Sequence, residues 1–125
     1  MIFVFGSNEA GVHGAGAAQT ARIVHGAMMG CGYGHVSNSF AIPTKDRTIQ
    51  HTLSLDTIEK YVQGFIAYAT GRPNLTFQVT RIGCGLAGLK DVDVAPLFFG
   101  VPENCFFDEK WRQYLGDHHT YWGTF

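Results

Sequence analysis

Two glycine-rich segments of this chain have the residue types needed to hold a negatively charged ligand. Residues 83–88 read Gly-Cys-Gly-Leu-Ala-Gly, and residues 11–16 read Gly-Val-His-Gly-Ala-Gly. A backbone with few large side chains can turn several N–H groups toward one anion, which suits a diphosphate. Glycines also occur where a strand turns tightly into a helix, so the pattern leaves both interpretations open. Neither segment is a Walker motif or a complete GxGxxG fingerprint.

Polar side chains follow two short apolar runs. Asn8 comes soon after the first run and could offer its amide to a sugar hydroxyl, although asparagine also commonly organises a turn at such a place. Lys45 follows Pro43 and Thr44 at the end of the second run. A lysine there could bind a phosphate, or act on a leaving group if its pKa were lowered. The usual alternative is a solvated surface lysine.

Histidines and cysteines give weaker signals. His13 lies inside a glycine-rich segment, where it either lines a ligand crevice or caps the following helix. Cys84 is either a reactive thiol or, more commonly for this residue type, a small buried side chain. His118 and His119 are adjacent and so do not face one direction, and no HxxxH or HExxH spacing occurs. We therefore expect no metal site and no bound cofactor. There is also no GxSxG elbow for a Ser-His-Asp triad.

Length and composition restrict the class of protein. The 125 residues have a net charge of −1 and 15% charged side chains, which predicts one compact domain over residues 1–125 and excludes disorder and coiled coil. The sequence lacks the clustered Lys and Arg residues that a protein coating duplex nucleic acid would need. Three cysteines without a CxxC pair favour a reducing, cytoplasmic compartment. No secretion signal and no apolar run of about 20 residues is present, so we expect no membrane association.

Hydrophobic periodicity predicts alternating strands and helices. Strands are expected at about 2–5, 39–42, 75–80 and 104–107, with Pro43 ending the second strand. Helices are expected at about 15–29, at 56–69 with a capping box from Asp56 to Glu59, at 92–99, and at 108–114 with Asp108 as the cap. The tail, residues 116–125, has no periodicity. This alternation indicates an α/β fold with a mostly parallel sheet covered by helices.

The same alternation predicts where a ligand would bind. In such sheets, ligands bind beyond the carboxyl ends of the strands. The polar or glycine-rich segments Gly6–Gly16, Pro43–Arg47 and Arg81–Leu89 each follow a predicted strand directly, so we expect all three to converge on one crevice. Tyr121 and Trp122 of the tail either cover this crevice or pack in the ordinary way.

These segments resemble a known family. Arg81–Leu89 resembles the second glycine loop of macro domains, the ADP-ribose-binding modules, and most closely the branch with the terminal ADP-ribose glycohydrolases and the DNA ADP-ribosyl glycohydrolase antitoxins. Ile42–Lys45 is similar to the Pro-Thr-Lys segment of the antitoxin branch, and Phe5–Asn8 with His13–Ala18 corresponds more loosely to the first loop. The chain also looks like compact macro-like proteins of bacteria and their phages.

The resemblance covers residues 1–107 and implies a three-layer α/β/α macro domain-like fold. It further implies a diphosphate on the two glycine loops, a distal ribose at Asn8, and Lys45 near the anomeric carbon of that ribose. Ala87 stands where the terminal glycohydrolases have an aspartate, so their lysine–aspartate chemistry does not carry over whole. No acidic residue early in the chain is evident for the adenine.

The implied activity is hydrolysis of an ADP-ribosyl linkage on a nucleic acid or a protein. The alternatives are a binder or sponge of ADP-ribose or cyclic ADP-ribose without turnover, and a hydrolase of another nucleotide derivative. The candidate catalytic residue is Lys45. The candidate ligand-binding residues are Asn8, His13, Gly14, Ala15, Gly16, Thr44, Gly83, Cys84, Gly85, Leu86, Ala87 and Gly88.

Overall fold

The computed structural model describes residues 1–125 and contains one mixed sheet of six strands. The strands lie in the order β2-β3-β1-β4-β5-β6, and only the β2–β3 pair is antiparallel. The predicted α/β fold with a mostly parallel sheet is therefore confirmed. The strand bounds are β1 (Ile2–Asn8), β2 (Gly34–Val36), β3 (Ser39–Lys45), β4 (Phe77–Val79), β5 (Cys105–Asp108) and β6 (Thr120–Gly123).

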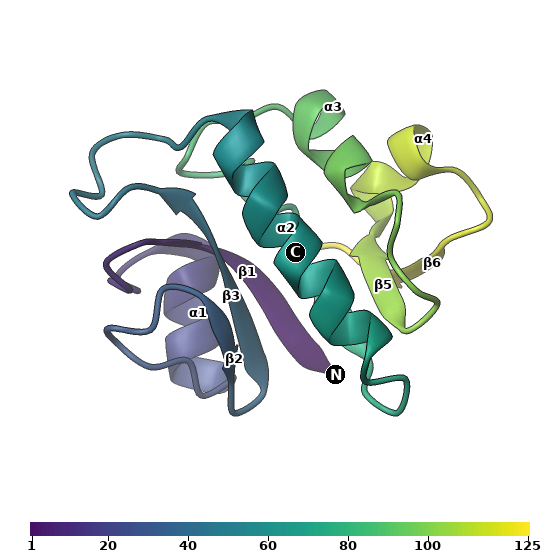
Figure 1. Ribbon diagram of the computed structural model, residues 1–125, viewed down its shortest axis with the longest axis horizontal. Coiled ribbons are helices and arrows are strands. Elements are labelled where there is room, and N and C mark those ends of the chain that lie inside the picture. Colours follow the sequence, from purple (N-terminus) through teal and green to yellow (C-terminus); the bar gives the residue numbers. More distant parts are fainter.

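Helices cover both faces of the sheet. The long helix α2 crosses one face, and α1 lies behind the sheet on the other (Figure 1). Two short helices and two 3₁₀ turns join α2 on its side and complete three layers. The bounds are α1 (Gly16–Val24), α2 (Leu55–Thr70), α3 (Asp91–Val94), η1 (Ala95–Phe98), η2 (Glu109–Trp111) and α4 (Arg112–Leu115).

Alternation along β1 divides the core into two clusters, because successive side chains of a strand point to opposite faces. Ile2 and Val4 face α2, where the buried residues are large and include several phenylalanines and Trp111. Phe3 and Phe5 face α1, where the buried apolar partners are all alanines: Ala18, Ala21, Ala27 and Ala41. The small side chains let α1 pack close to the sheet.

The N-cap of helix α2 lies two residues before the predicted cap. The Ser54 hydroxyl accepts a hydrogen bond from the backbone N–H of Thr57 at 3.2 Å, and Ser54 has the extended backbone of an N-cap. Asp56 lies in the first turn of the helix instead. The capping box expected from Asp56 to Glu59 is therefore wrong, because a serine hydroxyl upstream already satisfies the first turn.

Strand β3 continues through Pro43, against the expectation that the proline would end it. Residues 39–41 pair with β2, and Pro43 lies beyond that pairing, so the missing N–H is not needed on the β2 side. On the other side, Pro43 keeps its place opposite Ser7 of β1. The strand thereby carries Thr44 and Lys45 to the end of the sheet.

Two short strands were not predicted. β2 has three half-buried residues, and β6 forms in the tail, where the sequence has no periodicity.

Helix α1 ends at Val24 rather than near residue 29, shortly before Gly26, whose φ is +79°. The helices expected at 92–99 and 108–114 are each a combination of a 3₁₀ turn and a single α-helical turn. None of the helices has the length and apolar character needed to cross a membrane.

Candidate functional site

One cleft of about 590 Å³ lies at the carboxyl ends of β1, β3, β4 and β5. Its lining includes Asn8 and Lys45, which end β1 and β3, Arg81 just after β4, and Asp108, which ends β5. All three segments expected to converge contribute to it. The candidate ligand-binding residues that line it are Asn8, Gly14, Ala15, Gly16, Thr44, Gly83, Cys84, Gly85, Leu86 and Ala87.

The order of the strands sets the layout of this cleft. β1 and β4, which lead into the two glycine loops, are the central pair, while β3 and β5 flank them. Neighbouring strands lie about 4.8 Å apart, so Lys45 on β3 and Asp108 on β5 are separated by about 14 Å across the sheet. The cleft therefore has a middle made of backbone and two chemically different ends.

The middle of the cleft contains the uncapped start of α1. The N-cap, Ala15, has no side chain that can accept a hydrogen bond. The amides of Gly16, Ala17 and Ala18 donate to no protein atom, and the first helical bond of this region runs from Gln19 N to Ala15 O. Helix N-termini attract anions because their free N–H groups and the helix dipole act together. The cleft wall therefore contains three backbone N–H groups without a protein acceptor.

The loop after β4 presents a second set of free donors. The amides of Gly85, Leu86 and Ala87 also donate to no protein atom. The loop is held by hydrogen bonds on either side of them, from Cys84 N to Arg81 O and from Leu89 N to Gly83 O. Gly83 has a φ of +75°, and a β-carbon there would lie 2.7 Å from the Leu89 side chain, so this position requires glycine.

The two loops approach each other across the cleft. The Leu86 side chain reaches the start of α1, with its Cδ1 atom 3.4 Å from where a β-carbon on Gly16 would lie. Deeper in, the backbone of Gly83 lies against Gly6 of β1, where an added β-carbon would be 3.0 Å from Gly83 N. The two sets of free amides therefore belong to one concavity, of the kind in which successive backbone N–H groups can bind an anion.

Asn8 lines the cleft, but its side-chain amide forms its hydrogen bonds within the first loop, residues 9–15 between β1 and α1. The side-chain NH₂ donates to Val12 O at 2.8 Å, and the side-chain oxygen accepts from Val12 N at 2.9 Å. The turn-organising alternative for Asn8 is the one observed. Gly11 lets the loop pass close to another backbone segment, because a β-carbon at Gly11 would lie 2.4 Å from Gly30 C and 2.5 Å from Cys31 N.

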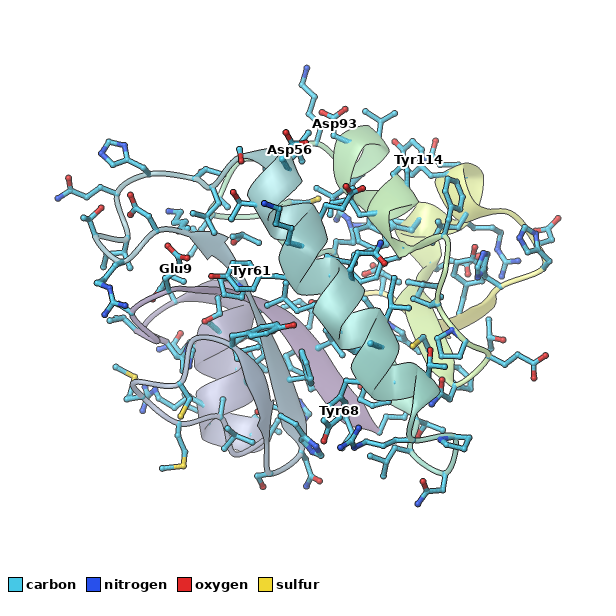
Figure 2. All side chains as sticks on the ribbon, in the orientation of Figure 1. Glu9, Asp56, Tyr61, Tyr68, Asp93 and Tyr114 are labelled. Atoms are coloured by element: carbon cyan, nitrogen blue, oxygen red, sulfur yellow. The ribbon has the colours of Figure 1, made fainter.

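The first loop is also fastened to α2. Glu9 accepts a hydrogen bond from the Tyr61 hydroxyl at 2.6 Å, and Figure 2 shows the two side chains side by side between β1 and α2. This bond, together with burial, raises the pKa of Tyr61 to about 12, because the neutral phenol is the donor. Tyr33 donates to Tyr61 O at 2.9 Å and closes the same corner. The loop that carries the α1 amides is thus held from both sides.

A β-bulge determines where Lys45 lies. Ser7 pairs with Pro43, but the next residue of β1, Asn8, pairs with Lys45, so Thr44 is an extra residue in β3. The Thr44 hydroxyl donates to Ser7 O at 3.2 Å and fixes this irregularity. None of the three ion pairs of the molecule involves Lys45. Its ammonium group is therefore available to a ligand at this end of the cleft.

The opposite end contains a buried carboxylate that the sequence identified only as a helix cap. Asp108 does cap η2, since its Oδ1 atom accepts from Lys110 N at 2.9 Å. Its Oδ2 atom accepts from the Thr124 hydroxyl at 3.2 Å and from Phe125 N at 3.1 Å. Asp108 and Phe125 both line the cleft. The signal that could have found Asp108 is its place at the end of a strand in a parallel sheet.

Arg81 forms part of the cleft wall and is held by Asp91. The guanidinium donates twice to the Asp91 carboxylate, at 2.7 and 2.6 Å, and the Trp111 indole N–H donates to the same group at 2.7 Å. These donors, Arg81 first, lower the pKa of Asp91 to about 2, because they stabilise its charged form. The wall is thus joined to the large core beneath it.

Two predicted site residues lie outside the cleft. His13 is completely buried; its Nε2 atom lies 3.1 Å from Cys31 O and its ring stands edge-on to Phe5. The crevice position considered for His13 is therefore not observed, because the loop places the ring against the smaller buried cluster, that of Phe3, Phe5 and the alanines on the α1 side of the sheet. Gly88 follows the free amides but does not line the cleft; its own N–H bonds to Gly85 O.

Two further alternatives are decided by local contacts. Cys84 lines the cleft, but burial raises the pKa of its thiol to about 12, and the thiol lies 3.5 Å from Ile82 O. Burial therefore disfavours the thiolate of Cys84, which favours the interpretation as a small wall residue. In the tail, the Trp122 indole donates to Val79 O and the Tyr121 hydroxyl donates to Gly116 O, so their polar groups are used in packing. Phe125 is the tail residue that lines the cleft.

No cluster of three or more His, Cys, Asp or Glu side chains in the molecule is arranged to hold a metal ion. Comparison of the chain with protein-family models, with curated proteins and with solved structures gives no match.

Proposed function

We propose that this cleft binds ADP-ribose, either free or as an ADP-ribosyl group on another molecule. The observation that carries the proposal is the pair of unpaired amide sets, Gly16–Ala18 and Gly85–Ala87, whose residues line the same cleft. Two such sets match the two phosphates of a diphosphate, and the space on either side suits its two substituents. The resemblance of Arg81–Leu89 and Ile42–Lys45 to macro domains supplies the identity of those substituents.

The β5 end of the cleft suits the adenine. The Asp108 carboxylate can only accept hydrogen bonds when ionised. Its Oδ2 atom already accepts two from the protein, whereas Oδ1 accepts only one and keeps an acceptor position for a ligand. The exocyclic amine of adenine is a donor, whereas the corresponding position of hypoxanthine is a carbonyl. Beside Asp108, the Phe125 ring offers an aromatic surface on which a purine can pack. This arrangement provides the acidic residue for which no early sequence position was evident.

The β3 end suits the distal ribose and the bond to be cleaved. In the proposed hydrolysis, the Lys45 ammonium donates a proton to the departing group as its bond to the anomeric carbon breaks. A water oxygen forms the new bond to that carbon, and the proton that this water releases returns to Lys45. The products are ADP-ribose and the protonated leaving group, so all atoms balance.

A second candidate, capture without turnover, is favoured by a specific observation. Asp108 is the only acidic residue that lines the cleft, and it lies about 14 Å from Lys45 across the sheet. No acidic residue therefore lines the Lys45 end of the cleft to activate the attacking water. Ala87, at the position where the terminal glycohydrolases have an aspartate, agrees with this candidate.

Binding is tested by calorimetry with ADP-ribose, ADP, AMP and inosine diphosphate ribose. We expect ADP-ribose to bind at least tenfold more tightly than AMP, since AMP reaches only one phosphate site and leaves the β3 end empty. Inosine diphosphate ribose should bind about tenfold more weakly than ADP-ribose, because its carbonyl would face Asp108. No binding of ADP-ribose at millimolar concentration would contradict the proposal.

Turnover is tested with Lys45→Ala on ADP-ribosylated oligonucleotide and ADP-ribosylated protein. The hydrolytic mechanism requires that this variant release no ADP-ribose while its affinity for free ADP-ribose stays within about tenfold of the unaltered chain. Lys60→Ala, which removes an exposed lysine from α2, is the matched control and should change neither quantity. If the unaltered chain binds ADP-ribose but releases none from either substrate, capture is the function.

A further inference from the structure

Ile49 has an unusual backbone conformation at the edge of the cleft. Its φ is 59°, in the left-handed region, which is a genuine outlier for a β-branched residue. The side chain is 41% exposed and lines the cleft on the same side as Lys45. It belongs to the loop of residues 46–52 between β3 and α2, which stands out from the body of the molecule in Figure 1.

Hydrogen bonds hold this loop in place despite the strain. Ile49 N donates to Asp46 O, and Asp46 N donates to His51 O. The Asp46 carboxylate accepts from both the N–H and the hydroxyl of Thr48. At its end, the Thr52 hydroxyl donates to Ala87 O at 2.8 Å, which ties the loop to the glycine loop of the anion site. The position of Ile49 is thus set relative to the free amides.

Strained residues persist where the surrounding structure enforces them, and they concentrate at ligand sites. Asparagine or glycine would occupy the left-handed region at lower cost, yet neither would give an apolar wall. We propose that Ile49 is a ligand-contacting residue, held in this conformation to close the Lys45 end of the cleft against the apolar face of the distal sugar. This inference rests on the proposed function.

The contact has a consequence for Lys45. A sugar ring covered by the Ile49 side chain displaces water from the region around the ammonium, and electrostatic interactions strengthen where water is excluded. Ile49 is therefore a specificity-determining residue for ligands that carry a second sugar. AMP and ADP, which lack that sugar, do not reach it.

The test uses two variants of the full chain, with thermal unfolding and calorimetry as readouts. Ile49→Asn relieves the strain and removes the wall, so we expect a midpoint higher by about 2–4 °C without ligand and an ADP-ribose affinity at least fivefold weaker. Ile49→Ala removes the wall but keeps a β-carbon in the left-handed region. It should weaken ADP-ribose binding similarly without raising the midpoint. ADP should bind both variants as it binds the unaltered chain.

Ser37→Asn is the matched control, because Ser37 is the other non-glycine residue with positive φ and does not line the cleft. It should raise the midpoint without changing ADP-ribose affinity. Unchanged ADP-ribose affinity in both Ile49 variants would overturn the inference, as would equal weakening of ADP and ADP-ribose, or a lower midpoint for Ile49→Asn. Failure of the unaltered chain to bind ADP-ribose would instead reject the proposed function.

Discussion

The two faces of the sheet differ in the size of the residues that cover them. The α2 face buries large side chains, among them Phe65, Phe98 and Trp111, in one continuous cluster. The α1 face buries Phe3 and Phe5 of β1, the ring of His13 and otherwise alanines. Buried apolar area is the main source of stability, so most of the stabilisation comes from the α2 side.

The difference also separates stability from the candidate function. Alanines on the α1 face bring the helix close to the sheet, and its free N-terminal amides thereby reach the carboxyl ends of the strands. The large core on the other face keeps the sheet rigid beneath them. Substitutions on the α2 face should therefore change the free energy of unfolding, whereas those on the α1 face should change ligand binding more than stability.

The largest effect is expected for Phe65→Ala, at the centre of the α2 face. Phe65 is fully buried and packs against the rings of Phe40, Phe77 and Phe98. The cavity should lower the free energy of unfolding by about 3–5 kcal/mol, measured by urea denaturation. ADP-ribose affinity of the folded fraction should be unchanged. A loss below 1 kcal/mol would contradict the assignment of stability to this face.

A smaller loss of stability and a large loss of binding are expected for Ala21→Leu, on the buried side of α1. Overpacking should cost about 1–3 kcal/mol and push the helix away from the sheet. ADP-ribose affinity, measured by calorimetry, should fall at least tenfold because the amides of Gly16–Ala18 move. Ala67→Leu, at an exposed position of α2, is the control and should alter neither measurement. Full binding by Ala21→Leu would contradict the role of the small face.

Asp91→Asn probes the joint between the cleft wall and the large core. At neutral pH we expect a loss of about 1–2 kcal/mol, since charge-assisted hydrogen bonds from Arg81 and Trp111 are weakened. The pKa of Asp91 is lowered to about 2, so its carboxylate stabilises the fold above pH 4 and loses this effect as the pH falls from 4 to 2. The urea midpoints of the unaltered protein and of the Asp91→Asn variant should therefore converge toward pH 2. A constant difference across that range would contradict this assignment.

The smallest effect is expected for Ser54→Ala. Removal of the hydroxyl that accepts from Thr57 N should cost about 1 kcal/mol by urea denaturation, because the first turn of α2 loses its cap. Ser54→Asp, which restores an acceptor, should recover most of that loss. ADP-ribose binding should be the same in all three chains, since Ser54 does not line the cleft.

Sequence reasoning succeeded where a pattern is local or follows a topological rule. The apolar run of β1 and the periodic apolar stripe of α2 are each visible in the sequence alone. The strand predicted at Ser39–Ile42 is in the right place, although β3 continues to Lys45. Convergence of the three loops follows from parallel strands ending at one edge of the sheet, which requires no side-chain detail.

Features that depend on which strands are neighbours could not be predicted. Asp108 reads as a helix cap, and only the position of β5 beside β4 brings it into the cleft. Phe125 enters the cleft because β6 pairs with β5, and four residues are too few for a periodic signal. His13 looks exposed in a glycine-rich segment, but the fold of that loop turns it into the small core.

The extra residue in β3 has a further consequence. Loss of Thr44 alone would leave the lysine opposite Asn8 but would remove the irregularity, and because side chains alternate along a regular strand it would alter how the ammonium is presented, while every other functional group kept its chemical identity. The presentation of this lysine is therefore encoded by residue spacing as much as by residue type. A single-codon deletion would be enough to change it, and designs that transplant the lysine must transplant the irregular backbone with it.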